Sequence, residues 1–346
     1  MDTGHVGRSI SAGALAVALF ISAWPADAAV TRRDLHVVTA DGIRLYVREV
    51  KPVAGTAREP LIMVHGARVA GVGSFDLPVR GGSLAADVAE STGRVVYVMD
   101  ARGYGASDRP AAMERPPAES KPLSRAYEVV RDIDAVAKEV ARANGQSQVA
   151  LLGWATGGMW ASFYASLHPE KVSHLIAFNS LYGGSDQHPT LIRRADAPLG
   201  GYSLNVASSL FTQWERSIPI EDKAQWRDPA VARAFEQAAL ASDPASAQRE
   251  PPAFRAPLGA IEDSSYQAGG RRLFDASSIT ARVLLIRSGL DFWSRAEDVS
   301  AFQHDAVRAA QVRVLALPNS THHVHLDRAD RGRDQMLQVM REFFSP

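Results

Sequence analysis

The sequence contains no cysteine, which excludes disulfides, thiol chemistry and cysteine-ligated zinc. It has no surplus of either charge, because 38 Lys and Arg residues face 38 Asp and Glu residues. No overall field therefore favours nucleic acid or an anionic membrane. Repeats, heptads and low-complexity tracts are also absent. What remains is an ordinary globular composition, 46% hydrophobic and 22% charged over 346 residues.

Long hydrophobic runs are lacking too. The uncharged apolar run at residues 10–24 falls short of the roughly 20 residues that span a bilayer. Arg8 precedes this run, and the small residues of Pro25-Ala26-Asp27-Ala28 follow it. This layout predicts a secretory signal peptide over residues 1–28, hence a periplasmic or secreted protein without a stable membrane anchor after cleavage. The alternative is an uncleaved N-terminal anchor.

Short apolar runs alternate with helical patterns along the rest of the chain. This alternation predicts a mainly parallel, eight-stranded sheet covered by helices on both faces, in the α/β class. A turn at Ala40-Asp41-Gly42 indicates that the first two strands form an antiparallel hairpin. The expected strands are residues 35–39, 43–50, 61–64, 95–99, 149–152, 172–178, 283–286 and 312–317, and the expected helices are 82–91, 124–144, 158–168, 296–310 and 331–344.

One long segment interrupts this alternation. Residues 183–278 contain no convincing buried strand, but they carry Trp214, Trp226, Phe235 and Phe254. That aromatic content argues against a disordered loop, which is the alternative. We therefore expect a helical cap at 183–278, inserted into a core formed by residues 29–182 and 279–346.

A glycine-rich turn follows the strand at 149–152 and leads directly into a helical pattern. It reads Gly153-Trp154-Ala155-Thr156-Gly157-Gly158. Strand, Gly-x-nucleophile-x-Gly and helix are the parts of a nucleophile elbow, whose central side chain projects from the sheet. Here the central residue is Ala155, which has only a methyl group. The Thr156 hydroxyl leaves the turn in another direction and is a poor replacement.

Three histidines, His322, His323 and His325, lie just past the last expected strand. A catalytic base is commonly found at such a position, and His322 is nearest the strand end. His323 and His325 are expected to pack beside it. A metal site is the alternative, but this spacing on an irregular loop does not readily converge on one ion. We predict no metal and no cofactor.

An acidic partner for His322 is expected at the end of the neighbouring strand. Asp291 ends the segment Ser288-Gly289-Leu290-Asp291, 31 residues before His322. Its carboxylate could orient the imidazole and stabilise its cation. Glu297 and Asp298 compete for this role, but both fall inside the next expected helix.

The loop after the strand at 61–64 reads His65-Gly66-Ala67-Arg68. It can aim the N–H of Ala67 at the same oxyanion as the N–H of Thr156, which would supply two donors. His65 is expected to be structural, and the charged, glycine-containing loop at 100–108 is expected to be scaffold.

Taken together, these segments resemble the α/β-hydrolase superfamily, and in particular its serine esterases and lipases. The resemblance covers residues 35–345 apart from the cap, with oxyanion loop, nucleophile, acid and histidine in the family's order. It implies the nucleophile at position 155, the acid at Asp291, the base at His322, and oxyanion donors at Ala67 and Thr156.

Ala155 departs from this pattern, because an acyl-enzyme cannot form without a nucleophile. A natural non-catalytic relative would have no reason to keep Asp291, His322 and both oxyanion loops. We therefore favour a serine-to-alanine variant of an exported carboxylic-ester hydrolase, inactive in this form. The alternatives are a natural binding protein on the same fold, or an amidase or lactonase. Candidate substrate contacts are Trp154, Trp293 and Arg68, and the expected ligand is a small-molecule or oligomeric ester, with no nucleic acid.

Overall fold

The computed structural model describes residues 1, 29–55, 58–188 and 198–345. The body of the predicted signal peptide, residues 2–28, lies outside the described residues. Within the described part of the chain, no helix is long and apolar enough to cross a membrane.

The centre of the molecule is an eight-stranded sheet with the order β1-β2-β4-β3-β5-β6-β9-β10. β1 pairs antiparallel with β2, and β2 pairs antiparallel with β4; every other neighbouring pair is parallel. The predicted sheet and its opening hairpin are confirmed. The strands are β1 (Val30–Val38), β2 (Arg44–Pro52), β3 (Leu61–Val64), β4 (Val96–Met99), β5 (Val149–Trp154), β6 (Val172–Phe178), β9 (Arg282–Leu290) and β10 (Gln311–Thr321).

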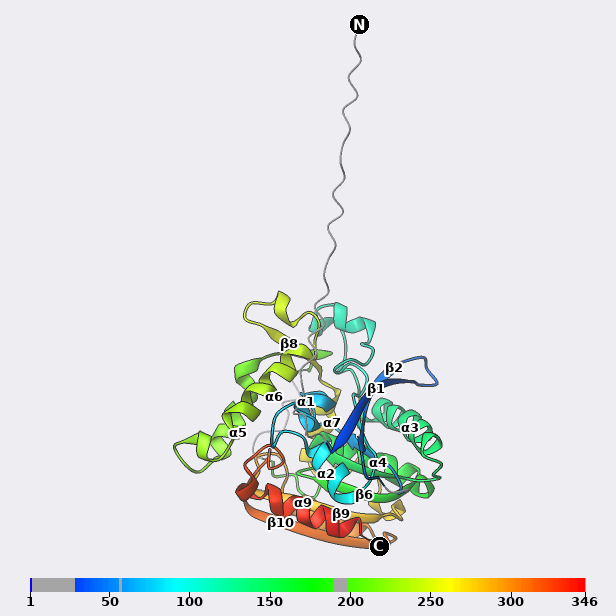
Figure 1. Ribbon diagram of the computed structural model, residues 1–346. Helices are drawn as coiled ribbons and strands as arrows, with labels where there is room; N and C mark the ends of the chain where they lie inside the picture. Colours follow the sequence, from blue (N-terminus) through cyan, green and yellow to red (C-terminus); the bar gives the residue numbers. More distant parts are fainter. Residues whose placement is uncertain (2–28, 56–57, 189–197, 346) are drawn as a thin grey trace.

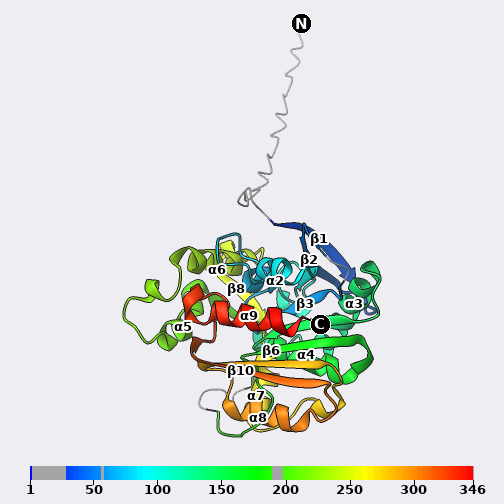
Figure 2. The same ribbon diagram turned by 60° about the horizontal axis from the view of Figure 1, so that its bottom comes forward.

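The central strands are short and apolar because both of their faces are covered. Every residue of β3, β4 and β5 is buried. On one face, α3 (Ala126–Ala143), α4 (Thr156–Leu167) and α8 (Ala296–Asp305) contribute to the larger hydrophobic cluster. On the other face, α2 (Leu84–Thr92) and α9 (Arg333–Phe343) contribute to the second cluster. Two views of the ribbon show this layered arrangement (Figures 1 and 2). The sequence did not predict the one-turn helix α1 (Gly71–Phe75).

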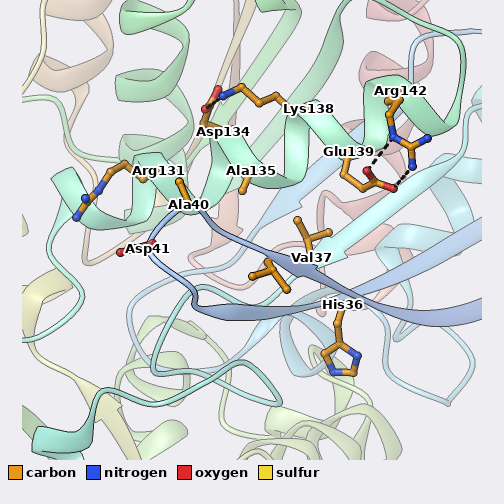
Figure 3. Close-up of a pocket in the computed structure, with 11 residues that line it drawn as sticks. His36, Val37, Ala40, Asp41, Arg131, Asp134, Ala135, Lys138, Glu139 and Arg142 are labelled. Atoms are coloured by element: carbon orange, nitrogen blue, oxygen red, sulfur yellow. Dashed lines mark hydrogen bonds and ion pairs between the residues drawn. The ribbon is translucent and has the colours of Figure 1, made fainter.

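A surface cavity of about 780 Å³ lies between the β1–β2 hairpin and α3 (Figure 3). Four of its charged side chains pair with one another, Glu139 with Arg142 and Asp134 with Lys138. Such exposed pairs are the normal solvated face of a helix.

Residues 183–278 contain α5 (Thr212–Ser217), α6 (Pro229–Ala241) and α7 (Gly259–Ala268), together with an antiparallel pair of strands. These strands are β7 (Tyr202–Val206) and β8 (Ala253–Pro257). The expectation that this segment has no buried strand is wrong, because all five residues of β8 are buried. The sequence of β8 hides this burial, since an arginine and a proline break its apolar run.

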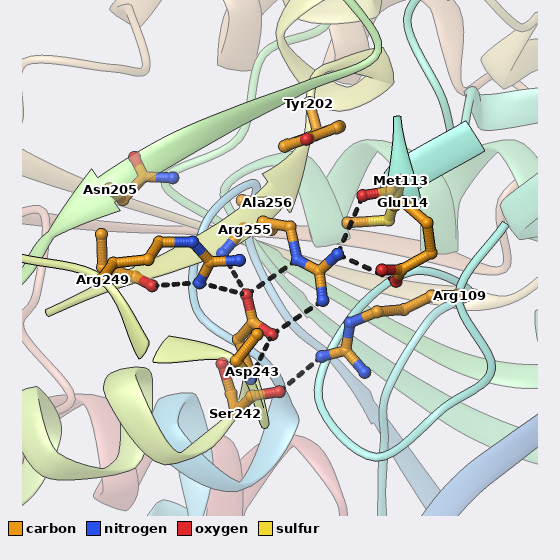
Figure 4. A network of polar contacts seen from close by, with 12 residues as sticks. Arg109, Met113, Glu114, Tyr202, Asn205, Ser242, Asp243, Arg249, Arg255 and Ala256 are labelled. Atoms are coloured by element: carbon orange, nitrogen blue, oxygen red, sulfur yellow. Dashed lines mark hydrogen bonds and ion pairs between the residues drawn. The ribbon is translucent and has the colours of Figure 1, made fainter. Parts of the chain in front are cut away.

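Arg255 of β8 can be buried because acidic groups surround its guanidinium (Figure 4). Its Nε lies 2.9 Å from Asp243 Oδ2, and its Nη1 lies 2.9 Å from Glu114 Oε1. Burial raises the pKa of the Asp243 carboxyl, but the hydrogen bonds from Arg255 and the Ala245 N–H, together with the charge of Arg255, hold this pKa below its usual range. Arg109 adds a hydrogen bond from Nη2 to the Ser242 carbonyl oxygen at 2.6 Å. These contacts fasten the segment 183–278 to the core loop that contains Arg109 and Glu114.

Candidate active site

The candidate site lies where the carboxyl ends of neighbouring parallel strands meet at one edge of the sheet. The loops after β3, β5, β6, β9 and β10 all leave from this edge, and these five strands are consecutive in the sheet. Carboxyl ends of parallel strands are the usual place for ligands in such sheets. The strand order thus brings together residues that are far apart in the sequence.

The turn after β5 has the conformation expected of an elbow. Ala155 adopts φ 52° and ψ −120° between the end of β5 and the start of α4. A side chain on Gly153 would collide with the carbonyl oxygen of Gly157, and one on Gly157 would collide with the carbonyl oxygen of Val64. The glycines are therefore required by close packing of the backbone, and Ala155 is held in a conformation that non-glycine residues seldom adopt.

His322 and Asp291 form a buried pair beside this turn. The distance from His322 Nδ1 to Asp291 Oδ1 is 2.7 Å, and the side chains are only 6% and 0% exposed. Asp291 also accepts hydrogen bonds from the backbone N–H groups of Trp293 and Ser294 and from the Ser294 hydroxyl. These donors hold the carboxylate in its acceptor role, so Nδ1 of His322 carries the proton and Nε2 is left to accept one.

The main chain of His322 is fixed from two sides. Its carbonyl oxygen accepts hydrogen bonds from Trp154 Nε1 at 3.1 Å and from Asn179 Nδ2 at 3.0 Å. Asn179 follows β6, and its side chain also bonds both the backbone N–H and the hydroxyl of Ser288. The sequence analysis did not single out Asn179. A hint was available, since Asn179 directly follows a buried strand, but it could not reveal which loops the amide joins.

A cavity of about 170 Å³ opens beside Ala155 and His322. Each of the three predicted substrate-contact residues, Trp154, Trp293 and Arg68, lies in its wall. The segment 183–278 supplies another part of the wall, through Leu210, Gln213, Phe235 and Ile261. The sequence analysis missed these four residues and Phe292, whose ring centroid lies 4.7 Å from that of His322.

Of the two predicted oxyanion donors, Ala67 borders this space, and Thr156 directly follows Ala155, which also borders it. Ala67 lines the cavity, and a Cβ placed on its neighbour Gly66 would lie 3.5 Å from the Ala155 methyl. Thr156 is the first residue of α4, where a backbone N–H has no acceptor within the helix. The Thr156 hydroxyl lies 3.4 Å from the Ser264 hydroxyl on α7. The arrangement thus has the parts needed to activate a hydroxyl at position 155 and to bind a developing oxyanion.

Residues 82–329 match the model of a family described as serine aminopeptidase, S33. The chain belongs to this family. The match includes the turn at Ala155, Asp291 and His322, and it begins after Ala67. This serine aminopeptidase family member is therefore a hydrolase of the α/β-hydrolase superfamily. None of the curated proteins compared with the sequence matches it.

Solved structures agree with the fold of this serine aminopeptidase family member. An esterase from Exiguobacterium antarcticum is 17% identical with a TM-score of 0.55, and covers 90% of this chain and 99% of its own. A thermophilic esterase from Thermogutta terrifontis, with malate bound, is 16% identical with a TM-score of 0.55. The match covers 90% of this chain and 100% of the esterase. An E-2-(acetamidomethylene)succinate hydrolase is 18% identical with a TM-score of 0.56, and covers 90% and 99%.

The two histidines that follow His322, His323 and His325, are buried in the interior of this hydrolase. His323 stacks on Trp214 with ring centroids 4.3 Å apart, and His325 is fully buried against Trp154. Burial lowers the pKa of both imidazoles well below its usual value. Among the residues that the structure describes, no group of three His, Asp or Glu side chains is arranged to hold a metal ion.

His65 and the loop at 100–108 of this family member serve as backbone supports. His65 Nδ1 lies 2.7 Å from the Gly66 carbonyl oxygen, and Nε2 accepts from the backbone N–H of Ala101 at 3.1 Å. Burial lowers the pKa of His65 to about 4, so this imidazole is neutral at neutral pH. The Asp100 carboxylate accepts from the N–H groups of Gly71 and Ala106. Asp298, which competed with Asp291 in the sequence, is instead paired with Arg295 at 2.8 Å.

Proposed function

We propose that this chain is the serine-to-alanine form of an exported hydrolase that cleaves carboxylic esters through a serine, histidine and aspartate triad. The observation that carries the proposal is the buried His322–Asp291 pair, 2.7 Å apart, beside a turn that holds Ala155 in a strained conformation. A protein without catalytic use for these groups gains nothing from burying an acid and a histidine together at a strained turn.

With serine at position 155, the reaction would begin with transfer of its hydroxyl proton to His322 Nε2. The serine oxygen then bonds to the ester carbonyl carbon, while the N–H groups of Ala67 and Thr156 hold the oxyanion. The bond to the alcohol oxygen breaks, and His322 returns the proton to that leaving oxygen. His322 next deprotonates a water molecule, whose oxygen bonds to the acyl carbon; the bond to the serine oxygen breaks, His322 returns the proton to that oxygen, and the acid is released. Alanine removes the first step and should lower the rate on the order of a million-fold.

The direct experiment is to restore the hydroxyl with Ala155→Ser and to measure hydrolysis of p-nitrophenyl acetate and butyrate. We expect kcat to rise on the order of a million-fold over the given chain. Ala155→Gly is the matched control, since it keeps the turn but adds no hydroxyl, and it should stay inert. A second substitution, His322→Ala, should abolish the activity that serine restores. If folded Ala155→Ser is as inert as the given chain, the result contradicts the hydrolase proposal and favours the alternative of a binding protein on this fold.

Cleavage of amides is the second candidate, and the aminopeptidase description of the family favours it. The same machinery serves both bonds, and they differ in the leaving group that His322 must protonate. Comparing p-nitroanilides of amino acids with p-nitrophenyl esters in Ala155→Ser separates the two. Higher kcat/KM on the anilides would replace the ester assignment by an amidase.

Export rests on the layout of residues 1–28, with one cation, an uncharged apolar run and small residues before Ala29. We expect the protein recovered outside the cytoplasm to begin at Ala29, as N-terminal sequencing would show. Recovery of the full-length chain in the membrane fraction would instead support an uncleaved anchor.

A further inference from the structure

Arg68 is a largely buried cation in the wall of the candidate active site. Its hydrogen-bond partners are neutral: Nε donates to Asn205 Oδ1 at 3.1 Å, Nη1 to the Ser209 carbonyl oxygen at 3.3 Å, and Nη2 to the Ser209 hydroxyl at 2.6 Å. A guanidinium has five N–H donors, two of them on each terminal nitrogen. These three hydrogen bonds therefore leave one N–H on Nη1 and one on Nη2.

Other buried arginines of this chain are paired with carboxylates. Arg102 lies 2.6 Å from Asp132, Arg255 lies 2.9 Å from Asp243, and Arg295 lies 2.8 Å from Asp298. In the described part of the chain, no acidic side chain comes within ion-pair distance of Arg68. Among the described residues, Arg109 also donates only to carbonyl oxygens, so the feature particular to Arg68 is that it lies without an acidic partner in the wall of the active-site cavity.

Burial lowers the pKa of the Arg68 guanidinium, and no neighbouring acid offsets this effect. The group stays protonated at neutral pH, since arginine starts from a very high pKa. A buried cation without an anion is costly, and that cost is relieved when a ligand supplies the opposite charge. The site is therefore prepared to gain binding energy from an anionic ligand.

We propose that Arg68 binds a carboxylate of the substrate, so that the preferred substrates are short hemiesters of dicarboxylic acids. Arg68 retains two N–H groups beyond its three hydrogen bonds, and a carboxylate oxygen is a strong acceptor for such charged donors. Other residues in the cavity wall, such as Trp154, Phe235 and Ile261, are apolar, which suits the hydrocarbon part of the ligand. The cavity volume of about 170 Å³ suits a short ligand. The proposal rests on the proposed ester hydrolase for the reaction, but binding can be tested without it.

Because Ala155 blocks turnover, the given chain can be titrated with substrates directly. We would measure the affinity of monomethyl glutarate and of its uncharged dimethyl ester by isothermal titration calorimetry at pH 7.5. The monoester should bind roughly tenfold more tightly or better, since hydrogen bonds to a charged group are the stronger kind. Arg68→Gln should remove this preference. The matched control Arg131→Gln, on the exposed face of α3, should keep it.

A second variant guards against misfolding of Arg68→Gln. In the given chain, Nε of Arg68 donates to the amide oxygen of Asn205 at 3.1 Å. Asn205→Asp is nearly isosteric and places a carboxylate at this position. This internal anion should weaken monoester binding about tenfold and leave diester binding unchanged.

Equal affinity of the given chain for the two esters would overturn the proposal, as would a preference that survives Arg68→Gln. Each result is independent of whether Ala155→Ser hydrolyses neutral esters. A preference for the monoester combined with an inert Ala155→Ser variant would support the anion site and contradict the hydrolase proposal. Hydrolysis of neutral esters without any preference in binding would support the hydrolase proposal and contradict the anion site.

Discussion

At the scale of single residues, Ala155 has a backbone conformation that is strained for alanine. Its φ of 52° and ψ of −120° lie in a region that costs a non-glycine residue about 1–3 kcal/mol. The neighbours enforce this conformation, because the N–H of Ala155 donates to the Phe178 carbonyl oxygen at 3.0 Å and the flanking glycines pack against backbone. The strain therefore comes from the backbone of the turn and not from the side chain at position 155.

Ala155→Gly should therefore stabilise the protein. Glycine relieves the strain but costs about 0.5–1 kcal/mol in unfolded-state entropy, which leaves a net gain of about 1 kcal/mol. Urea denaturation of the two proteins measures this difference. A loss of stability in Ala155→Gly would mean that the methyl packing outweighs the backbone strain.

Asp291 should control the protonation state of His322 in the restored enzyme. Adding Asp291→Asn to Ala155→Ser should lower kcat about 10⁴-fold, because an amide no longer holds Nδ1–H and Nε2 loses its role as acceptor. Ester hydrolysis at neutral pH measures the effect. The exposed substitution Glu139→Gln is the control and should leave kcat unchanged; a small effect of Asp291→Asn would remove Asp291 from the triad.

The sequence could predict the positions of Ala155, Asp291 and His322 because each follows a recognisable strand. It could not predict the role of Asn179 or the partners of Arg68. Those contacts join segments more than 100 residues apart, such as Arg68 with Asn205, and no local pattern encodes them. The roles in catalysis themselves stay predictions until the variants are assayed.

At the scale of elements, β8 is one of the attachments of the segment 183–278 to the core, through Arg255 and Glu114. Asp243 binds both Arg255 and Arg249, and Arg255 in turn reaches Glu114 on the core side. Because Asp243 and Arg255 are buried, removing one of them leaves the other with only its more exposed partner, Arg249 or Glu114.

Asp243→Asn should destabilise the protein by about 3 kcal/mol, the usual cost of breaking a buried ion pair from one side. Hydrogen exchange should show the first loss of protection in β7 and β8. Lys138→Met, which removes a largely exposed ion pair with Asp134, is the control and should change the free energy of unfolding by about 0.5 kcal/mol or less. A uniform loss of protection would contradict a local anchoring role.

The core elements could be read from sequence and the inserted segment could not. Buried strands such as β5 are continuous apolar runs, whereas β8 carries Arg255 and ends in proline. Its burial depends on acids from elsewhere in the chain. The five-residue helix α1 is too short to show a helical period.

At the scale of the whole molecule, buried neutral histidines make stability depend on pH. The pKa of His65 is about 4 in the folded protein against an ordinary value of 6.5, so the unfolded chain binds a proton first on acidification. The contribution of His65 is fully present above pH 6.5 and is lost as the pH falls toward 4, about 3 kcal/mol in all. Asp100 and Asp327 act in the opposite direction, because burial raises the pKa of each to about 6.

His65→Gln isolates this contribution. The variant should lose less stability than the parent chain between pH 6.5 and about 4.5, by about 1 kcal/mol per pH unit, although it is less stable at neutral pH. Urea denaturation at several pH values gives both slopes, and the aspartate contributions cancel in their difference. Parallel slopes would show that His65 does not carry the acid sensitivity.

The strand order also sets when the site can exist during synthesis. The turn at Ala155 precedes His322 by 167 residues, and β10 can join the sheet only beside β9. At roughly 5–20 residues per second, the ribosome makes the turn about 8–30 seconds before the histidine. A nascent chain with serine at this turn would stay without its base for that time, and fragments released before β10 would be inert.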